Sequence, residues 1–504
     1  MTATVKKFLP LLLFVSLLAL VSRSHSLAAA NQVSGSPQPS AEMAARIARI
    51  ENGLLPAVVV KGAPPKPMTL AERMAFYKVP GVSMAFFDHG QIVWARGYGF
   101  ADIASKRPIT PDTLFQAASI SKPVAALAAL RLVLDGKLSL DEDVNAKLKT
   151  WKVPENAFTE KEKVTVRRIL SHSAGLTVHG FPGYASDETL PTVVQILNGE
   201  KPANTEAIRV DVVPGTMWRY SGGGYVILQT LMSDVTGEPF PKIMHDLVLQ
   251  PAGMTHSTYE QPLPKSRAGE VAIPYRANGE PVKGGPHTYP EMAPAGLWTT
   301  PSDLAKMAIE VQKEYAGQSS KILSQPMARQ MLTRQTGAWG LGFALNQPDH
   351  ALLFGHGGAN EGYRCDLEAY IDSSQGFAVM TNSDRGGDLY AEVLRAVAKE
   401  YGWPDFHPTE HTLTKMNPAA FQAYAGTYEL TGLGQLHVTL RDNSLYIQAD
   451  PLGPNPIEMF PESTNNFFVM SNDITFTFDR LTADGPAYQL TVHAGPQTFV
   501  AKKM

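Results

Sequence analysis

The stretch TLFQAASISKPVAALAAL, residues 113–130, decides the fold of this chain. It contains an S-x-x-K pattern in which Ser119 and Lys122 lie three residues apart, on one face of a helix. Pro123 follows at once, and proline is tolerated only in the first turn of a helix. The pattern therefore predicts a helix that begins at or close to Ser119.

The apolar sequence after Pro123 favours a catalytic role for this serine and lysine. At a helix start, Ser119 is near the positive end of the helix dipole, and its backbone N–H is free to donate to an oxyanion. The following segment, VAALAALRLVL, is almost wholly apolar, so we expect it to be buried and to take Lys122 inside with it. Burial lowers the pKa of a lysine because it disfavours the charged form. We therefore predict Ser119 as the nucleophile and Lys122 as a proton acceptor.

Further segments support this interpretation through their order along the chain. They are PGVSMAFFDHGQIVWARGYGFAD (80–102), GKLSLDEDV (136–144), ILSHSAGL (169–176) and PAGLWTTPSDLAKM (294–307). With the nucleophile segment they resemble the penicillin-recognising serine hydrolases, in the branch of class C β-lactamases, D-Ala-D-Ala carboxypeptidases, D-aminopeptidases and related esterases. The resemblance covers roughly residues 41–402. It implies a β-lactamase-like α+β fold, with an antiparallel sheet flanked by helices and an additional helical region.

The family's second motif, Y-x-N, is similar to Tyr220-Ser221-Gly222 in the segment WRYSGGGY. The resemblance implies that Tyr220 is a general base that takes the proton from Ser119, with its pKa held down by Lys122. It also makes Ser221 and Gly222 candidates to contact the substrate. Gly222 stands where the family has an asparagine that contacts the substrate amide, and this departure argues against efficient β-lactam recognition.

The family's third motif, K-T-G, is similar to His356-Gly357-Gly358 in LLFGHGGANEGY. The resemblance implies a strand that lines the site, where the paired glycines admit the substrate backbone and the N–H of Ala359 is the second oxyanion donor. A histidine anchors a substrate carboxylate less well than a lysine does. Arg364 is therefore a further candidate to bind such a carboxylate.

Composition excludes several other classes of protein. The chain has 504 residues, with 44 Lys+Arg against 47 Asp+Glu and a net charge of −3. This balance leaves no basic surface for nucleic acid, so we expect no nucleic-acid partner. At about 150 residues per domain, the length suits one large domain and a smaller one.

The N-terminus has the pattern of an export signal. Lys6 and Lys7 precede the apolar run FLPLLLFVSLLALV, and small residues follow at 28–30. No other stretch approaches the roughly 18 apolar residues that a spanning helix needs. We therefore predict a signal peptide over 1–30 and a periplasmic or secreted protein with no stable membrane span in its mature chain.

The pattern changes after residue 402. Residues 403–416 contain several prolines and histidines and are predicted to be a linker. Beyond them, apolar residues alternate with polar ones in short runs separated by turn residues, as in 436–440 and 474–478. We predict a hydrolase domain over 31–402 and a small antiparallel β-barrel over 417–504, similar to the lipocalin-like appendages of some family members.

Two patterns suggest other chemistry and are rejected. His407 to His411 match H-x-x-E-H, but a zinc site of this type needs a helix, and these residues lie in the linker. The single cysteine, Cys365, has no C-x-x-C partner and is predicted to be a small buried hydrophobe. We expect no metal and no organic cofactor, and we expect His172 to order its own loop.

The resemblance implies two-step acyl transfer on a small molecule or a short peptide. Peptidases of this family often carry C-terminal β-domains, so we favour a peptidase or amidase for short or unusual peptides, such as linearised microcystin-like peptides. An esterase of small acyl esters is the alternative. A β-lactamase and a catalytically inactive protein that binds cell-wall peptides are further alternatives. The oligomeric state is left open.

Overall fold

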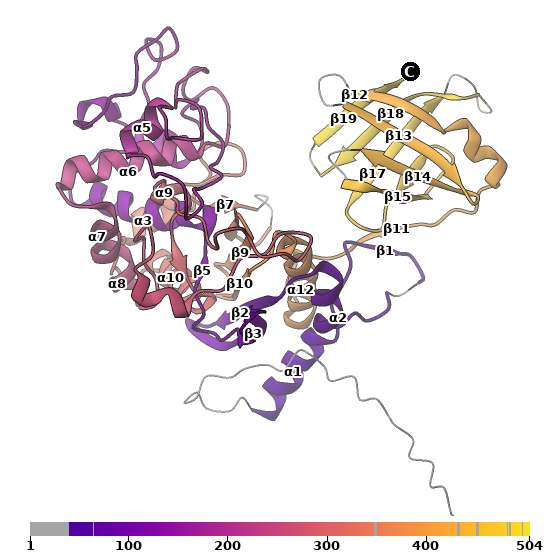
Figure 1. Cartoon of the computed structure of the whole chain (residues 1–504), viewed down its shortest axis with the longest axis horizontal. Helices are drawn as coiled ribbons and strands as arrows, with labels where there is room; N and C mark the ends of the chain where they lie inside the picture. Colours follow the sequence, from indigo (N-terminus) through magenta and orange to yellow (C-terminus); the bar gives the residue numbers. More distant parts are fainter. Residues whose placement is uncertain are drawn as a thin grey trace, which may run out of the picture.

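The computed structural model describes residues 40–63, 65–346, 350–430, 434–449, 453–480, 482, 485–495 and 497–504. The predicted signal peptide, 1–30, lies outside these residues. Figure 1 shows two parts, an α+β body and a closed β-barrel formed by the C-terminal strands. In the described ranges, no helix combines the length and the apolar character needed to cross a membrane.

A seven-stranded sheet forms the middle layer of the body, in the order β4-β3-β2-β10-β9-β8-β7, and all neighbouring strands are antiparallel. The early hairpin pairs with the last strand of the body, with Ala85 opposite Ala378. The strands are β2 (Gly81–Asp88), β3 (Gln91–Asp102), β4 (Arg107–Pro108), β7 (Ala344–Leu345), β8 (Leu353–Asn360), β9 (Tyr363–Tyr370) and β10 (Gly376–Thr381).

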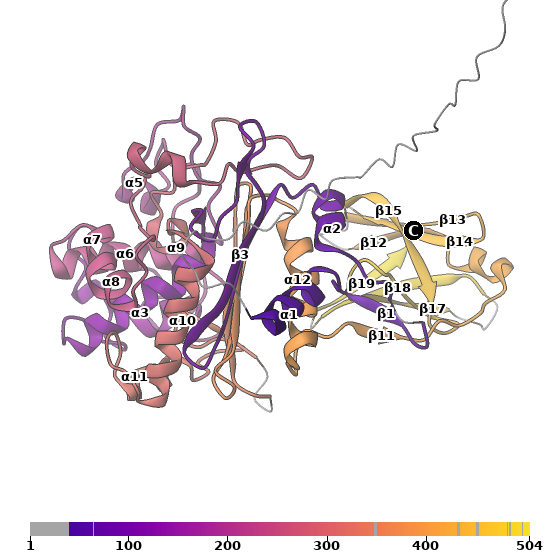
Figure 2. The same ribbon diagram turned by 90° about the horizontal axis from the view of Figure 1, so that it is seen from below.

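Helices cover both faces of this sheet (Figure 2). The alternation along β2 explains why: Ala85 and Phe87 pack into the core beneath α3 and α10, while Met84 and Phe86 pack beneath α1, α2 and α12. On the second face lie α1 (Ala41–Glu51), α2 (Leu70–Tyr77) and α12 (Gly386–Tyr401). The other helices are α3 (Ser121–Leu134), α4 (Val166–Leu170), α5 (Val193–Asn198), α6 (Gly222–Thr236), α7 (Phe240–Met244), α8 (Gln250–Ala252), α9 (Met292–Ala295), α10 (Pro301–Ala316) and α11 (Gln325–Met331).

The C-terminal strands form a closed antiparallel barrel of eight strands. It closes where β12 pairs with β19, with Tyr428 opposite Lys503. Alternate residues such as Leu436, Val438, Phe476 and Phe478 fill its interior, as the period of two predicts. The strands are β12 (Gly426–Leu430), β13 (Gly434–Arg441), β14 (Ser444–Ala449), β15 (Gly453–Pro461), β16 (Asn466–Phe468), β17 (Ile474–Arg480), β18 (Ala487–Ala494) and β19 (Gln497–Lys503).

The segment between body and barrel contains a strand of its own. β11 (Thr409–His411) pairs in parallel with β1 (Val58–Val60), which precedes the sheet. His411 Nδ1 lies 2.9 Å from an oxygen of Glu462 in the barrel, and Thr409 donates to Asp473 at 2.7 Å. The predicted linker is therefore fastened to both parts of the chain. The predicted fold class, a β-lactamase-like α+β body followed by a small antiparallel barrel, is confirmed.

Residues in the middle of α3 are buried on all sides, whereas its end is exposed. The effect of a substitution on stability should therefore depend strongly on where it lies along this helix. Leu127 is fully buried, whereas Leu134, at the end of the same helix, is 42% exposed. Leu127→Ala should therefore lower the free energy of unfolding by about 2–5 kcal/mol, because it leaves a cavity. Leu134→Ala, the matched control, should change it by less than about 1 kcal/mol. Urea denaturation of the two variants measures the difference, and equal losses would contradict this packing.

Candidate active site

Ser119 lies at the start of α3, in the short 3₁₀ turn η1 (Ala118–Ile120), as its predicted place at a helix start requires. It is the only residue of 113–130 that is not buried. Ala118, just before it, has φ 48, in the left-handed region that costs an L-residue roughly 1–2 kcal/mol. This turn leaves the serine partly exposed at the start of a helix whose residues 121–130 are all buried.

Lys122 is 2% exposed, as the apolar helix predicts. Its Nζ lies 3.0 Å from Ser119 Oγ and 3.0 Å from the carbonyl oxygen of Pro294. Burial lowers the pKa of Lys122 to about 7. Near neutral pH much of the amine is therefore uncharged, and it can accept the serine proton while it still donates to the carbonyl.

The segment after α9 holds the nucleophile turn in place. Leu297 N donates to Ser121 Oγ at 3.0 Å, and Ala117 N donates to Leu297 O at 2.8 Å. The short strands β5 (Phe115–Gln116) and β6 (Trp298–Thr299) pair beside these bonds. The turn is thus fixed against the segment that supplies the carbonyl partner of the lysine.

Tyr220 is brought to the same place, just before α6. Lys122 Nζ lies 4.8 Å from the centroid of its ring, over the face of the ring. Burial raises the pKa of Tyr220, and a hydrogen bond with Ser119 lowers it by less. The expectation that Lys122 lowers the pKa of Tyr220 is therefore wrong. The amine lies over the tyrosine ring, and burial leaves it only partly charged near neutral pH. Tyr220 is a neutral phenol here, suited to relaying a proton rather than to removing one.

The structure corrects the expected role of Ser221. This residue is the N-cap of α6: its Oγ accepts from Gly224 N at 3.1 Å and donates to Thr177 O at 2.8 Å. It is only 4% exposed. Its hydroxyl is used in holding the helix start and is not available to a substrate.

Gly222 is likewise buried rather than presented to a ligand. A Cβ atom at this position would lie 2.9 Å from Phe181 Cε2 and 3.1 Å from His179 O. The space into which the family's asparagine projects is therefore closed by an aromatic ring and a backbone carbonyl. The expectation that Gly222 contacts substrate is corrected for this reason.

His356 lies on β8 and is 6% exposed. Its Nδ1 is 2.6 Å from Gly357 O, and because a carbonyl only accepts, this nitrogen carries the proton. The lone pair is therefore on Nε2, which is buried and has no hydrogen-bond partner among the described residues. Burial, with a smaller contribution from Lys122, lowers the pKa of His356 to about 3. The residue thus offers no positive charge to a ligand.

The glycines of β8 allow this strand to lie against the nucleophile turn. A Cβ atom on Gly358 would meet Ala117 O at 2.3 Å, whereas Gly357 and Ala359 are exposed. β7 pairs with β8 only as far as Gly355, so in the described part of the chain the rest of that edge has no strand partner. An open edge of this kind suits a substrate with a peptide-like backbone.

A cavity of about 380 Å³ lies beyond Ala359. Arg364 lines it, but its Nη1 donates to Asn360 O at 2.6 Å and to Tyr363 O at 2.8 Å, and its Nη2 pairs with Asp384 at 3.3 Å. The guanidinium is therefore engaged within the protein, which argues against the predicted role as a carboxylate receptor. The cavity is lined by Phe181, Arg276, Tyr289, Ala359, Asn360, Glu361, Arg364 and Asp384.

Aromatic rings surround Tyr220, and the two tryptophans among them were not predicted from the sequence. The ring centroids of His172, Trp339 and Trp218 lie 4.2, 5.9 and 6.5 Å from that of Tyr220. Trp218 stands two residues before the tyrosine, so its place next to the motif was a usable signal. Trp339 comes from a distant loop, and no local pattern marks it.

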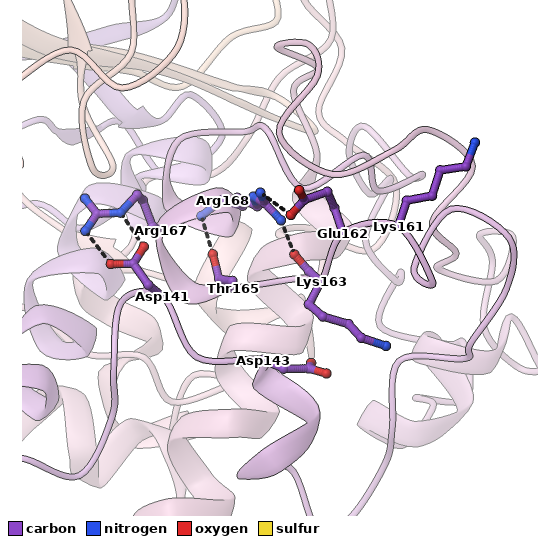
Figure 3. A pocket seen from close by; sticks show the side chains of 8 residues that line it. All are labelled: Asp141, Asp143, Lys161, Glu162, Lys163, Thr165, Arg167 and Arg168. Carbon is purple, nitrogen blue, oxygen red and sulfur yellow. Dashed lines mark hydrogen bonds and ion pairs between the residues drawn. The ribbon is translucent and has the colours of Figure 1, made fainter.

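Other polar features of the body and the linker stand apart from Ser119. One is a surface pocket of about 440 Å³. Figure 3 shows its lining side chains, among which Arg167 pairs with Asp141 and Arg168 with Glu162, so the charges of both arginines are already compensated. The H-x-x-E-H residues end in β11 rather than on a helix. Within the described ranges, no group of three or more His, Cys, Asp or Glu side chains could hold a metal. Cys365 is buried, as predicted, and donates to Ala117 O at 3.1 Å.

A buried lysine whose amine reaches the hydroxyl of a partly exposed serine defines a class, the serine hydrolases with an S-x-x-K nucleophile. The family comparison agrees. Residues 69–401 match the model described as Beta-lactamase, so the chain belongs to the beta-lactamase family and is an enzyme of the β-lactamase-like serine hydrolases. Residues 410–503 match a second model, described as Domain of unknown function (DUF3471).

Individual proteins are similar to this chain in sequence or in structure. Penicillin-binding protein 4* of Bacillus subtilis is 24% identical over 412 residues, which cover 77% of this chain and 88% of that protein. The octameric penicillin-binding protein homologue from Pyrococcus abyssi is similar in structure, with a TM-score of 0.57 and 24% identity over 86% of this chain and 98% of that one. A D-amino acid amidase from Ochrobactrum anthropi has a TM-score of 0.51 and 23% identity over 66% of this chain and 97% of that one. The two structural likenesses show the shared fold.

Because Phe181 lies close to Gly222, an asparagine introduced at this position should destabilise the protein. Gly222→Asn should lower the free energy of unfolding by about 1–3 kcal/mol, because its Cβ lies too close to the phenylalanine ring. In a Phe181→Ala background the same change should cost less, and a double-mutant cycle by chemical denaturation measures this coupling. Additive effects would show that Phe181 does not close this space.

Proposed function

We propose that the protein is an exported amidase or peptidase that cleaves short or unusual peptides through an acyl-enzyme on Ser119. One observation carries the proposal: the buried Lys122 amine lies 3.0 Å from Ser119 Oγ. Export is inferred from the signal-like residues 1–30, and the first residue of the mature chain, determined by mass spectrometry, tests it.

Acylation follows from this contact. Ser119 Oγ attacks the carbonyl carbon of the amide, and the serine proton passes to the neutral amine of Lys122. The N–H groups of Ser119 and Ala359 would hold the oxyanion. The lysine ammonium then returns the proton through the Tyr220 hydroxyl to the leaving nitrogen as the C–N bond breaks. The raised pKa of Tyr220 suits this relay, because the phenol gains one proton as it gives up another.

Deacylation reverses the same route with water in place of the amine. A water molecule attacks the acyl carbon, and its proton passes by way of Lys122 to Ser119 Oγ as the ester bond breaks. The product is a carboxylic acid. The lysine is neutral at the end of the cycle, ready for the next substrate.

His356 supplies no positive charge to anchor a substrate carboxylate. Its imidazole is buried and neutral, with the ring proton on Nδ1, which argues against a substrate that is recognised through a carboxylate. The ring and the backbone carbonyl that close the space at Gly222 leave no room for the family's asparagine, which argues against efficient β-lactam recognition. The fold shared with a D-amino acid amidase is consistent with an amide substrate.

The proposal is tested with a library of short peptides that includes D-residues and linearised cyclic peptides, read by mass spectrometry. Wild type should cleave amide bonds, and Ser119→Ala should cleave them at least about 10³-fold more slowly. Ser139→Ala, which removes an exposed serine outside the site, is the matched control and should keep wild-type activity. A fluorophosphonate probe should label wild type and not Ser119→Ala.

Each alternative gives a different result in the same set of assays. Turnover of p-nitrophenyl esters without any amide cleavage would replace the amidase with an esterase, and rapid nitrocefin turnover would indicate a β-lactamase. An acyl-enzyme that forms and never hydrolyses would indicate a binding protein. Equal labelling of wild type and Ser119→Ala would remove Ser119 as the nucleophile.

A further inference from the structure

His172 occupies an unusual place in the turn that follows α4. It is 2% exposed and has φ 55, in the left-handed region that is uncommon for residues other than glycine. Strain at a buried residue persists only where the surrounding structure determines it. The hydrogen bonds of His172 show which residues hold it in this conformation.

Beside the bond that its own N–H donates to Ile169 O, His172 accepts two hydrogen bonds, from the residues on either side of Tyr220. Arg219 N donates to His172 O at 2.7 Å, and Ser221 N donates to His172 Nδ1 at 3.1 Å. The imidazole also lies against the tyrosine ring, with centroids 4.2 Å apart and planes 30° apart. His172 therefore contacts the tyrosine segment in three ways: it accepts hydrogen bonds from the residue before Tyr220 and the residue after it, and its imidazole packs on one face of the tyrosine ring.

These contacts also set the protonation state of the imidazole. Nδ1 accepts the Ser221 N–H, so it bears the lone pair, and the ring proton is on Nε2. A proton on Nδ1 would face the N–H and break the bond. Burial first, and then the nearby Lys122, hold the pKa of His172 well below its usual range, in agreement with a neutral ring.

We propose that His172 is the positioning residue for Tyr220, which it holds with its hydroxyl toward Ser119 by accepting the Ser221 N–H and packing on the tyrosine ring. This inference rests on the proposed acyl-transfer function of the site. His172 touches neither substrate nor the reacting atoms in this role. It acts through Tyr220, so its loss should slow the chemical step more than it weakens substrate binding.

The chain offers a matched control in His179. Its ring centroid is 4.8 Å from that of Tyr220, so it also lies against the tyrosine, but no side-chain hydrogen bond from it to 219–221 is found in the described residues. His179 is exposed, and its backbone carbonyl, which accepts from Gly222 N, is unchanged by substitution. The two histidines therefore differ in the bond that the proposal invokes.

The experiment compares His172→Phe, His172→Asn and His179→Phe in the full-length protein, using the best peptide from the library. His172→Phe keeps a ring and removes the acceptor, so kcat should fall about 10- to 100-fold while KM stays within about 3-fold. Asparagine places an oxygen where Nδ1 lies and tolerates positive φ, so His172→Asn should stay within about 5-fold of wild-type kcat. His179→Phe should stay within about 2-fold.

Thermal unfolding of each variant separates positioning from folding. Should His172→Phe fail to fold, His172→Asn decides the question: retained kcat supports the proposal, and a loss as large as 100-fold in folded protein overturns it. Wild-type kcat in folded His172→Phe, or an equal loss in His179→Phe, also overturns it. A wild type that turns over no acyl substrate is a different result, because it removes the proposed function itself.

Discussion

The burial of Lys122 is the constraint on which the rest of the active site depends. An unpaired charge inside a protein costs several kcal/mol, so a buried lysine without a carboxylate loses its proton more readily than one in water. Among the described residues its hydrogen-bond partners are one hydroxyl and one carbonyl, and burial alone brings its pKa to about 7. The environment that makes this residue costly for folding makes it a base at neutral pH.

Three residues near the site have backbone conformations that are uncommon for residues other than glycine. Ala118, His172 and Val178 have φ values of 48, 55 and 62, and a β-branched residue such as valine is rare in that region. Ala118 precedes the partly exposed nucleophile, and His172 accepts hydrogen bonds from the segment that carries the tyrosine. The carbonyl oxygen of Val178 lies 3.4 Å from the Ser221 hydroxyl. Strain of this kind preorganises a site, because the groups need not rearrange during the reaction.

Local features of the site could be predicted from sequence, and features made by distant contacts could not. Ser119 and Lys122 lie one helical turn apart with Pro123 beside them, and the period of two in the C-terminal strands is equally local. The raised pKa of Tyr220 comes from its burial among segments that are distant in the sequence, and the closure of the space at Gly222 depends on Phe181. No local sequence motif indicates either of these two features. His172 was predicted to order its loop, but its bonds to Arg219 and Ser221 appear only once the two segments are packed together.

The most direct test of this account is a titration of the Lys122 amine itself. Protein with isotope-labelled lysine, followed by NMR across pH 5–11, reports the pKa of each side chain, and Lys122→Met identifies the resonance. Lys122 should titrate at about 7, because it is buried without a counter-charge. A value near 10.5, the ordinary pKa of lysine, would contradict it, since the amine would then be charged at neutral pH and could not take the serine proton.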